Sequence, residues 1–161
     1  MPLIPARGDL FATPGLTALA HGCNCEGAMG KGIAVAFRER WPEMYAAYRQ
    51  RCRDGRFGLG DVFLWELDGV SVFNLGTQET WRRAGRDRAE LPAIRRAVAE
   101  MIRLAEARGL AEIALPRIGA GLGGLDWAEV RALLEELAAE TPVRLLVCEE
   151  HAPGEPLRPL D

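Results

Sequence analysis

The sequence predicts a single-domain α/β protein in which helices pack on a mixed sheet of about six strands. Short runs with β-strand composition alternate with longer runs of helical periodicity. The chain has 161 residues, enough to bury one hydrophobic core. Its composition, 48% hydrophobic and 27% charged, is close to that of an average globular domain.

Six strands are expected from the apolar runs. They lie near Leu3–Ala6, Thr17–His21, Asp61–Leu67, Val70–Leu75, Glu112–Leu115 and Val143–Cys148. Asp68 and Gly69 form a hairpin turn signal between two of these runs, so those two strands are predicted to be antiparallel. The other strands are separated by helical segments and are predicted to be parallel, which gives a mixed sheet.

Four helices are expected between the strands. The clearest has apolar residues at steps of three and four, namely Leu91, Ile94, Val98, Met101, Ile102 and Ala105. Gly109 is expected to end this helix, because glycine readily adopts the left-handed conformation found just after many helices. Asp126 and Glu129 form a capping box at the start of the last helix. Gly32–Trp41 and Pro42–Arg51 are predicted as two helices in the first half, with the proline in a first turn.

Residues 1–149 are assigned to one domain, and residues 150–161, with three prolines and little apolar content, to a loose tail. No segment reaches the roughly 18 uninterrupted apolar residues of a membrane span, and the N-terminus lacks a signal-peptide pattern. We therefore expect a cytoplasmic protein with its four cysteines reduced. Cys23 and Cys25 lack the spacing of a zinc or redox motif, and His21 and His151 lie far apart. No metal site is expected.

The net charge of −3 argues against a globally basic nucleic-acid binder but leaves room for a local basic patch. Three segments lack the apolar pattern of residues that form a hydrophobic core, and each follows a predicted strand. They are His21–Gly32, Asn74–Trp81 and Pro116–Trp127. Ligands bind beyond the carboxyl ends of the strands in open α/β sheets. The three segments are therefore predicted to line one cleft.

Two of these segments are rich in glycine and lead into helices. Glycine lets the backbone approach a ligand closely, and a helix N-terminus adds free N–H donors and a partial positive charge. Two such loops facing one cleft fit a diphosphate, and Lys31 adds a cation there or faces solvent. The alternative for either loop alone is a tight strand-to-helix turn. Neither loop matches the phosphate-binding loop of nucleotide hydrolases or the full dinucleotide fingerprint.

The motifs Gly8–Ala12, His21 with Asn24, Met29–Ala34 and Pro116–Trp127 together resemble the macrodomains. The similarity is greatest to the branch that contains the terminal ADP-ribose protein glycohydrolase and the DNA ADP-ribosyl glycohydrolase antitoxins. It runs from about Leu3 to Cys148 with the motifs in the same order. The resemblance implies a three-layer α/β/α fold around a mixed six-stranded sheet, with ADP-ribose as the ligand and no cofactor.

The resemblance also implies binding roles at matching positions. Asp9 matches the residue that recognises adenine, with a turn or cap aspartate as the alternative, and Leu10 lines that pocket. Asn24 matches a contact to the distal ribose, and Thr77 ends the strand beside it. The two phosphate loops match Gly30, Lys31, Gly32 and Ile33, and Arg117, Ile118, Gly119, Ala120, Gly121, Leu122 and Gly123.

The catalytic positions depart from the family. The branch places a lysine after the threonine that matches Thr77, where this chain has Gln78. Aspartates that act in two of the relatives fall on Gly123 and Ala34. A glutamine cannot form a Schiff base, but it can orient water or a sugar hydroxyl. We therefore predict Gln78 and Asn24 as the catalytic pair and Asp126 as a helix cap.

The function that follows is release of ADP-ribose from a modified macromolecule. The target is either DNA, through a thymidine-type base linkage, or acidic protein side chains. Trp81 with Arg82, Arg83, Arg86 and Arg88 would stack a base and meet phosphates, or else form a solvated loop. The alternatives are an ADP-ribose reader without activity and a hydrolase of small derivatives such as the 1''-phosphate or an O-acetyl ester.

Overall fold

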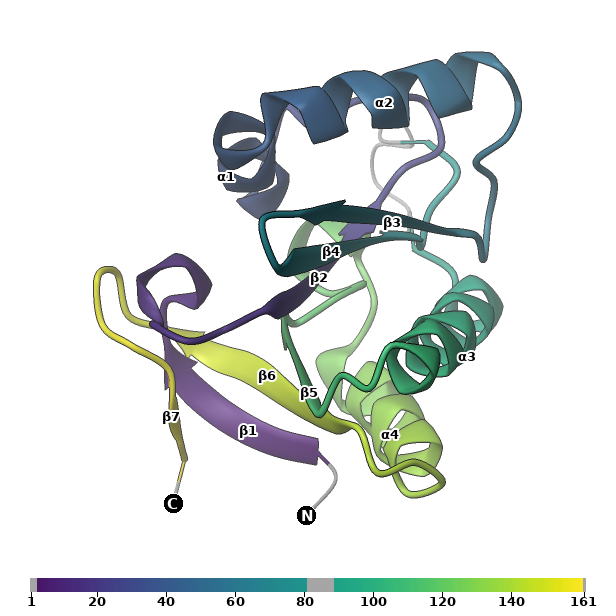
Figure 1. The fold of residues 1–161 in the computed structure, drawn as a ribbon. Helices are drawn as coiled ribbons and strands as arrows, with labels where there is room; N and C mark the ends of the chain where they lie inside the picture. Colours follow the sequence, from purple (N-terminus) through teal and green to yellow (C-terminus); the bar gives the residue numbers. More distant parts are fainter. Residues whose placement is uncertain (1–2, 81–88, 161) are drawn as a thin grey trace.

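The computed structural model describes residues 3–80 and 89–160. One seven-stranded sheet forms the middle layer, with α1 (Ile33–Arg40) and α2 (Pro42–Arg53) on one face. On the other face lie α3 (Leu91–Ala107) and α4 (Trp127–Ala138), as Figure 1 shows. The three-layer α/β/α prediction is confirmed.

The strands lie close to the predicted runs. They are β1 (Leu3–Gly8), β2 (Ala18–Cys23), β3 (Val62–Leu67), β4 (Val70–Gly76), β5 (Glu112–Pro116), β6 (Arg144–His151) and β7 (Arg158–Pro159). Two short 3₁₀ turns, η1 (Leu10–Ala12) and η2 (Gly121–Gly123), follow β1 and β5. Within the described residues no helix is long and apolar enough to cross a membrane.

The sheet is mixed, as predicted, in the order β3-β4-β2-β5-β6-β1-β7. The five strands from β4 to β1 in this order run parallel, and the two edge strands run antiparallel to their neighbours. Asp68 and Gly69 have φ angles of 50° and 79° in the β3–β4 turn, the left-handed pair that an Asp-Gly hairpin favours. Gly109, with φ of 68°, follows the C-terminus of α3 as expected.

The C-terminal segment is a correction to the sequence prediction, because it is not a loose tail. The β6 strand continues to His151, and Arg158–Pro159 pairs with β1 as a seventh, antiparallel strand. The backbone N–H of Asp9 donates to Glu155 O at 2.7 Å, and that of Leu160 donates to Pro5 O at 2.8 Å. A proline is acceptable on this edge strand because Leu160 donates the inward hydrogen bond, and an N–H at Pro159 would point away from β1 toward solvent.

Two hydrophobic cores lie on opposite faces of the sheet. The core under α3 and α4 consists of aliphatic, methionine and phenylalanine side chains, with Ile94, Met101 and Leu134 fully buried. The core under α1 and α2 is built around Phe37 and Tyr48 and also contains buried polar groups. The polar loops that follow β2, β4 and β5 lie at the carboxyl edge of the sheet, where they meet both cores.

Candidate functional site

The loops after β2, β4 and β5 line one cleft of about 360 Å³, within the usual size of a ligand site. These strands are adjacent in the sheet, and Cys23 pairs with Gly76 in register, so their ends meet at one edge. The cleft brings together most of the predicted site: Asn24, Gly30, Lys31, Gly32, Ile33, Thr77, Gln78, Arg117, Ile118, Gly119, Ala120, Leu122 and Gly123. Gly121 belongs to the same loop but does not line the cleft wall.

The first glycine loop offers unpaired backbone donors at the cleft. Gly32 has φ of 63° and directly precedes α1, so this loop turns sharply into the helix. Within the described part of the chain, the N–H groups of Gly30, Gly32 and Ile33 have no acceptor. Helix N-termini leave such groups free to bind an anion.

The second glycine loop has the same property from the opposite wall. Gly119 has φ of 76° and lies so close to Ile94 that a Cβ there would be 2.6 Å from Ile94 Cδ1. This close packing requires glycine. The N–H groups of Gly119, Gly121 and Leu122 find no acceptor among residues 3–80 and 89–160. Two rows of free donors therefore border one cavity.

The two loops approach each other over the cleft. Leu122 is 54% exposed, and a Cβ on Gly32 would lie 3.1 Å from its Cδ1 atom. Lys31 and Arg117 are exposed side chains on the two loops that add positive charge to the walls. The cavity suits an anion with two charged groups, such as a diphosphate.

Asn24 lies at the cleft, but its side chain also holds the first loop together. Its Oδ1 accepts from the N–H groups of Glu26 and Ala28, at 3.0 and 3.2 Å, and from the Tyr48 hydroxyl at 2.9 Å. Its Nδ2 donates to Ala28 O at 2.8 Å. The oxygen is therefore occupied, and the second N–H of the amide is the group left to contact a ligand.

Gln78 and Thr77 continue β4 into the cleft, and a segment missed by the sequence analysis holds them there. Gln78 forms an antiparallel bridge with Ala89, whose N–H donates to Gly123 O at 2.9 Å. The N–H of Glu90 donates to Thr77 O at 2.9 Å. We call Ala89 and Glu90 the clamp, because they tie the strand end to the second glycine loop. This pairing forms only when the tertiary fold brings the strand end, Ala89 and the second glycine loop together, and no local sequence motif indicates it.

The Gln78 amide lies on the cleft side of this bridge. Its Nε2 donates to Thr80 O at 3.2 Å. Its Oε1 would be 3.9 Å from a Cβ on Gly123. The amide thus sits between the strand end and the second loop, where it can reach a ligand in the cavity.

Asp9 and Leu10 lie in a second pocket that shares Gly32, Ile33 and Arg117 with the cleft. The Asp9 carboxylate caps η1 by accepting from Phe11 N at 2.9 Å, and it accepts from Gly154 N at 3.0 Å. Partial burial alone would raise the pKa of Asp9, but these two hydrogen bonds, together with the nearby His151 and Arg40, outweigh it and the pKa is lowered. The aspartate therefore has the structural role given above as the alternative, in a position that still faces the pocket.

His21 and the cysteines lie near the cleft but are not suited to acid–base or nucleophilic work. His21 is fully buried, stacks on Phe37 at 3.9 Å and contacts Asn74 Oδ1 at 2.7 Å through Nε2. Burial lowers the pKa of His21 to about 4, against a smaller raising effect of Asn74. Burial raises the pKa of the Cys23 and Cys25 thiols, which disfavours thiolates.

Two further predictions concern residues outside the cleft. Asp126 caps α4 as predicted, since its Oδ1 accepts from Ala128 N at 3.1 Å. The Glu129 side chain accepts no hydrogen bond from the Asp126 N–H in the described part, so the capping box is half formed. The proposed base-stacking residues Trp81, Arg82, Arg83, Arg86 and Arg88 lie outside the described residues. Within the described ranges, no group of three or more His, Cys, Asp or Glu side chains is arranged to hold a metal ion.

The family model described as Macro domain matches residues 20–134. The chain is 36% identical over 139 residues to a DNA ADP-ribosyl glycohydrolase of Mycobacterium tuberculosis, covering 84% of this chain and 38% of that protein. It is 30% identical over 141 residues to an ADP-ribose glycohydrolase of Bos taurus, covering 88% and 87%.

Solved structures agree with the sequence relatives. The macrodomain of Mycobacterium tuberculosis DarG has a TM-score of 0.80 at 33% identity, over 94% of this chain and 97% of that one. The macrodomain of Thermus aquaticus DarG has a TM-score of 0.80 at 30% identity, over 91% and 97%. The chain spans 38% of the length of the curated mycobacterial relative, so its similarity is to one part of that protein.

Proposed function

The chain belongs to the macrodomain family, and on that premise we propose that it is an ADP-ribosyl hydrolase that releases ADP-ribose from modified DNA. The names of the relatives support the choice of DNA, since those at 36% and 33% identity are called DNA ADP-ribosyl glycohydrolases. Modified acidic protein side chains are the other target to be tested beside DNA.

The observation that carries the proposal is the pair of donor rows across the cleft. Gly30, Gly32 and Ile33 on one wall and Gly119 and Leu122 on the other present N–H groups without acceptors in the described residues. A diphosphate placed between them would receive hydrogen bonds from both sides. The positive end of α1 and the side chains of Lys31 and Arg117 add to the attraction.

The second pocket provides room for the nucleoside. It continues from the cleft over Gly32, Ile33 and Arg117, and Leu10 and Phe11 form part of its apolar wall. A purine ring there would bury apolar surface, and its amino group would face the Asp9 carboxylate. The opposite end of the cleft, at Asn24 and Gln78, is left for the distal ribose.

The chemistry at the distal ribose would depend on positioning. In hydrolysis, the oxygen of a water molecule bonds to the anomeric carbon, the bond from that carbon to the base nitrogen breaks, and a water proton passes to the leaving nitrogen. No carboxylate or imidazole lines the cleft within the described residues, so none of them supplies a strong base for this proton. The Gln78 amide and the free Asn24 N–H would orient the water and the ribose, and the loop N–H groups would hold the diphosphate fixed.

The test is to measure free ADP-ribose released from two substrates in parallel, a single-stranded DNA modified on a base and a protein modified on acidic side chains. We expect release from the DNA. Gln78→Ala should slow turnover by about 10- to 100-fold, equivalent to about 1.4–2.7 kcal/mol, while ADP-ribose affinity is kept. Borohydride should trap no covalent adduct on the parent protein, because an amide has no nucleophilic amine.

The alternative is a reader that binds ADP-ribose without cleaving it. The absence of a carboxylate or imidazole from the described cleft walls favours it. Gln78→Lys separates the two functions, because it supplies the amine that the related enzymes carry. If the parent, Gln78→Ala and Gln78→Lys all bind ADP-ribose and release none from either substrate, the hydrolase proposal is rejected in favour of the reader.

A further inference from the structure

Positive charge is concentrated in the segment that forms the α1–α2 layer. Residues 31–56 contain seven basic and three acidic side chains, a formal charge of +4 in a chain whose total is −3. The first residues of this segment line the cleft. An acidic protein thus presents a basic surface on one side of its candidate site.

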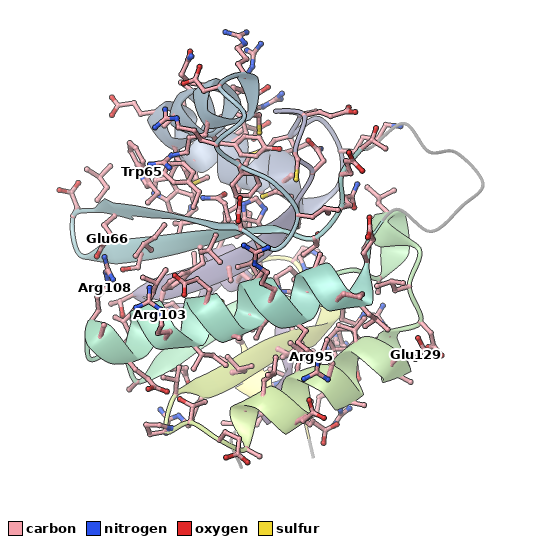
Figure 2. All side chains as sticks on the ribbon, turned by 90° about the vertical axis from the view of Figure 1, so that its right-hand side faces the viewer. Trp65, Glu66, Arg95, Arg103, Arg108 and Glu129 are labelled. Carbon is pink, nitrogen blue, oxygen red and sulfur yellow. The ribbon has the colours of Figure 1, made fainter. Side chains whose placement is uncertain are left out.

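Arginines on the opposite side of the sheet are neutralised by ion pairs. Arg103 Nε lies 2.6 Å from Glu100, and Arg108 Nε lies 3.1 Å from Glu66 of β3. Figure 2 shows both arginines along α3, with Arg108 beside Glu66 and with Arg95 between α3 and α4. Arg95 pairs with Glu136 of α4. On this side of the sheet, these three arginines are therefore neutralised by neighbouring carboxylates.

On the α1–α2 layer, arginines lie over aromatic rings instead. The guanidinium groups of Arg38 and Arg49 lie 5.6 and 5.5 Å from the centroid of the same ring, that of Tyr45. Arg38 and Arg49 have no carboxylate partner among the described residues. The same holds for the exposed Arg53, one helical turn beyond Arg49. Arg56 is different, since it pairs with Asp54 at 3.0 Å. We call Arg38, Tyr45, Arg49 and Arg53 the arginine cluster.

An aromatic ring holds a guanidinium in place without neutralising it. The N–H groups in the guanidinium plane remain available, and their fork matches the oxygens of a phosphate. Two arginines anchored on one ring are thus prepared for anions at a lower cost in side-chain entropy than two free ones.

The arginine cluster lies behind the wall of the cleft. A Cβ on Gly27 would be 3.5 Å from the Cα and Cγ atoms of Arg49, so the stem of this arginine packs on the first loop. Gly27 lies between Asn24 and Ala28, which both line the cleft. This is the end of the cleft assigned above to the distal ribose, where the modified macromolecule would be attached.

We propose that the arginine cluster binds the backbone phosphates of the DNA strand that carries the modified base. This inference rests on the proposed function, because it places the strand next to the base being released. A strand brings a phosphate on each side of the modified nucleotide, whereas a modified protein brings no fixed set of charges. The expected strand is single, since a base inside a duplex cannot enter a pocket.

The experiment measures binding of an unmodified, fluorescein-labelled oligothymidylate of twelve nucleotides by fluorescence anisotropy at 50–200 mM salt. Arg38→Gln/Arg49→Gln is compared with the parent and with Arg103→Gln/Arg108→Gln, the α3 variant, which removes the same charge from α3 and the residue that caps its C-terminus. We expect the first variant to lose about 10-fold in affinity. Its plot of log K against log salt should be shallower by about 1.4, or about 0.7 for each phosphate contact on a single strand. The α3 variant should match the parent.

The proposal is overturned if the parent does not bind the oligonucleotide, if Arg38→Gln/Arg49→Gln binds like the parent, or if the α3 variant loses as much. It is also overturned if the first variant loses turnover only on modified protein. Arg38→Lys/Arg49→Lys keeps the charge and should retain most of the salt dependence, which excludes loss through misfolding. A parent that releases no ADP-ribose from DNA but binds the oligonucleotide through these arginines would reject the hydrolase and leave the surface in place.

Discussion

The two faces of the sheet treat polar groups in opposite ways. Under α3 and α4 the core is built from apolar side chains, with Ser71 of β4 buried on the same face, and arginines on the surface are paired with carboxylates. Under α1 and α2 the protein buries His21 and Asn24, and arginines on that layer lie over aromatic rings. The first glycine loop leads into α1 on this second side, whereas the second glycine loop packs against Ile94 of α3.

The α3–α4 side therefore contributes mainly to stability, and the α1–α2 side contributes more of the groups that can bind a ligand. Buried polar groups without partners cost folding free energy, whereas exposed ones are hydrated until a ligand replaces the water. The α3–α4 side supplies mainly apolar burial. The α1–α2 side keeps cations and the first row of donors available for a ligand. Substitutions on the two sides should therefore affect different measurements.

The largest effect on stability is expected on the α3–α4 side. Leu134 of α4 is fully buried in that core. Leu134→Ala should lower the free energy of unfolding by roughly 3–5 kcal/mol, through lost burial and a residual cavity. Chemical denaturation measures this loss, and calorimetry on the folded variant should give unchanged affinity for ADP-ribose. A tenfold fall in affinity with the fold intact would show that the two sides are coupled.

The buried His21 should make the α1–α2 side sensitive to acid. Its pKa is about 4 in the folded protein, against an ordinary histidine value of 6.5 for the unfolded chain, so the unfolded chain binds the proton more readily. The contribution of His21 to the free energy of unfolding is fully present above pH 6.5 and is lost as the pH drops toward 4. For a pKa shift of this size the loss is about 3 kcal/mol. Denaturation at several pH values tests this, with His151→Gln as control because His151 is exposed. If the control variant loses the pH dependence, the effect belongs to His151.

The donor rows should be sensitive to added negative charge. Gly30 lines the cleft, its φ is not in the left-handed region, and a Cβ there would meet no atom within 4 Å. Gly30→Asp should therefore fold normally and weaken ADP-ribose by more than about 30-fold, or about 2 kcal/mol, by repelling the diphosphate. Gly30→Asn has the same shape without the charge and should bind much better. Equal affinities for the two variants would remove the diphosphate from this position.

The smallest effect is expected at the cap of α4. Asp126→Ala should cost about 1 kcal/mol of stability because Ala128 N loses its acceptor, whereas Asp126→Asn keeps a good cap. Thermal unfolding measures both variants. Turnover should be the same for both. An inactive but stable Asp126→Asn would mean that the carboxylate takes part in catalysis.

Local signals predicted most of the fold. The Asp68-Gly69 turn, the stop at Gly109 and the cap at Asp126 each depend on a few adjacent residues, and the structure has all three. The two glycine loops were also predicted from the sequence, because several residues without Cβ next to a helix start let the backbone approach a ligand closely. Their meeting at one cleft followed from the rule that parallel strands end on the same edge.

Long-range contacts escaped the sequence analysis. The β7 strand has two residues, one of them a proline, and exists only because β1 is beside it. Asn24 was predicted to contact substrate, but Tyr48, which lies 24 positions away, fixes its oxygen as part of the loop. The clamp at Ala89 joins parts of the chain that are separate in sequence. Such pairings have no local pattern, because the residues involved are ordinary until the fold brings them together.

The pairing of β1 with β7 leaves the two chain ends close together. Leu160 donates to Pro5 O, and Figure 1 shows both ends at the side of the molecule away from α1 and α2. A short glycine-serine linker would therefore join residue 160 to residue 3 without crossing the cleft. New ends opened at the exposed Asp68-Gly69 turn would give a circular permutant with the same ligand site. For the same reason, this architecture can be inserted as a module into a loop of another protein, with its cleft pointing outward.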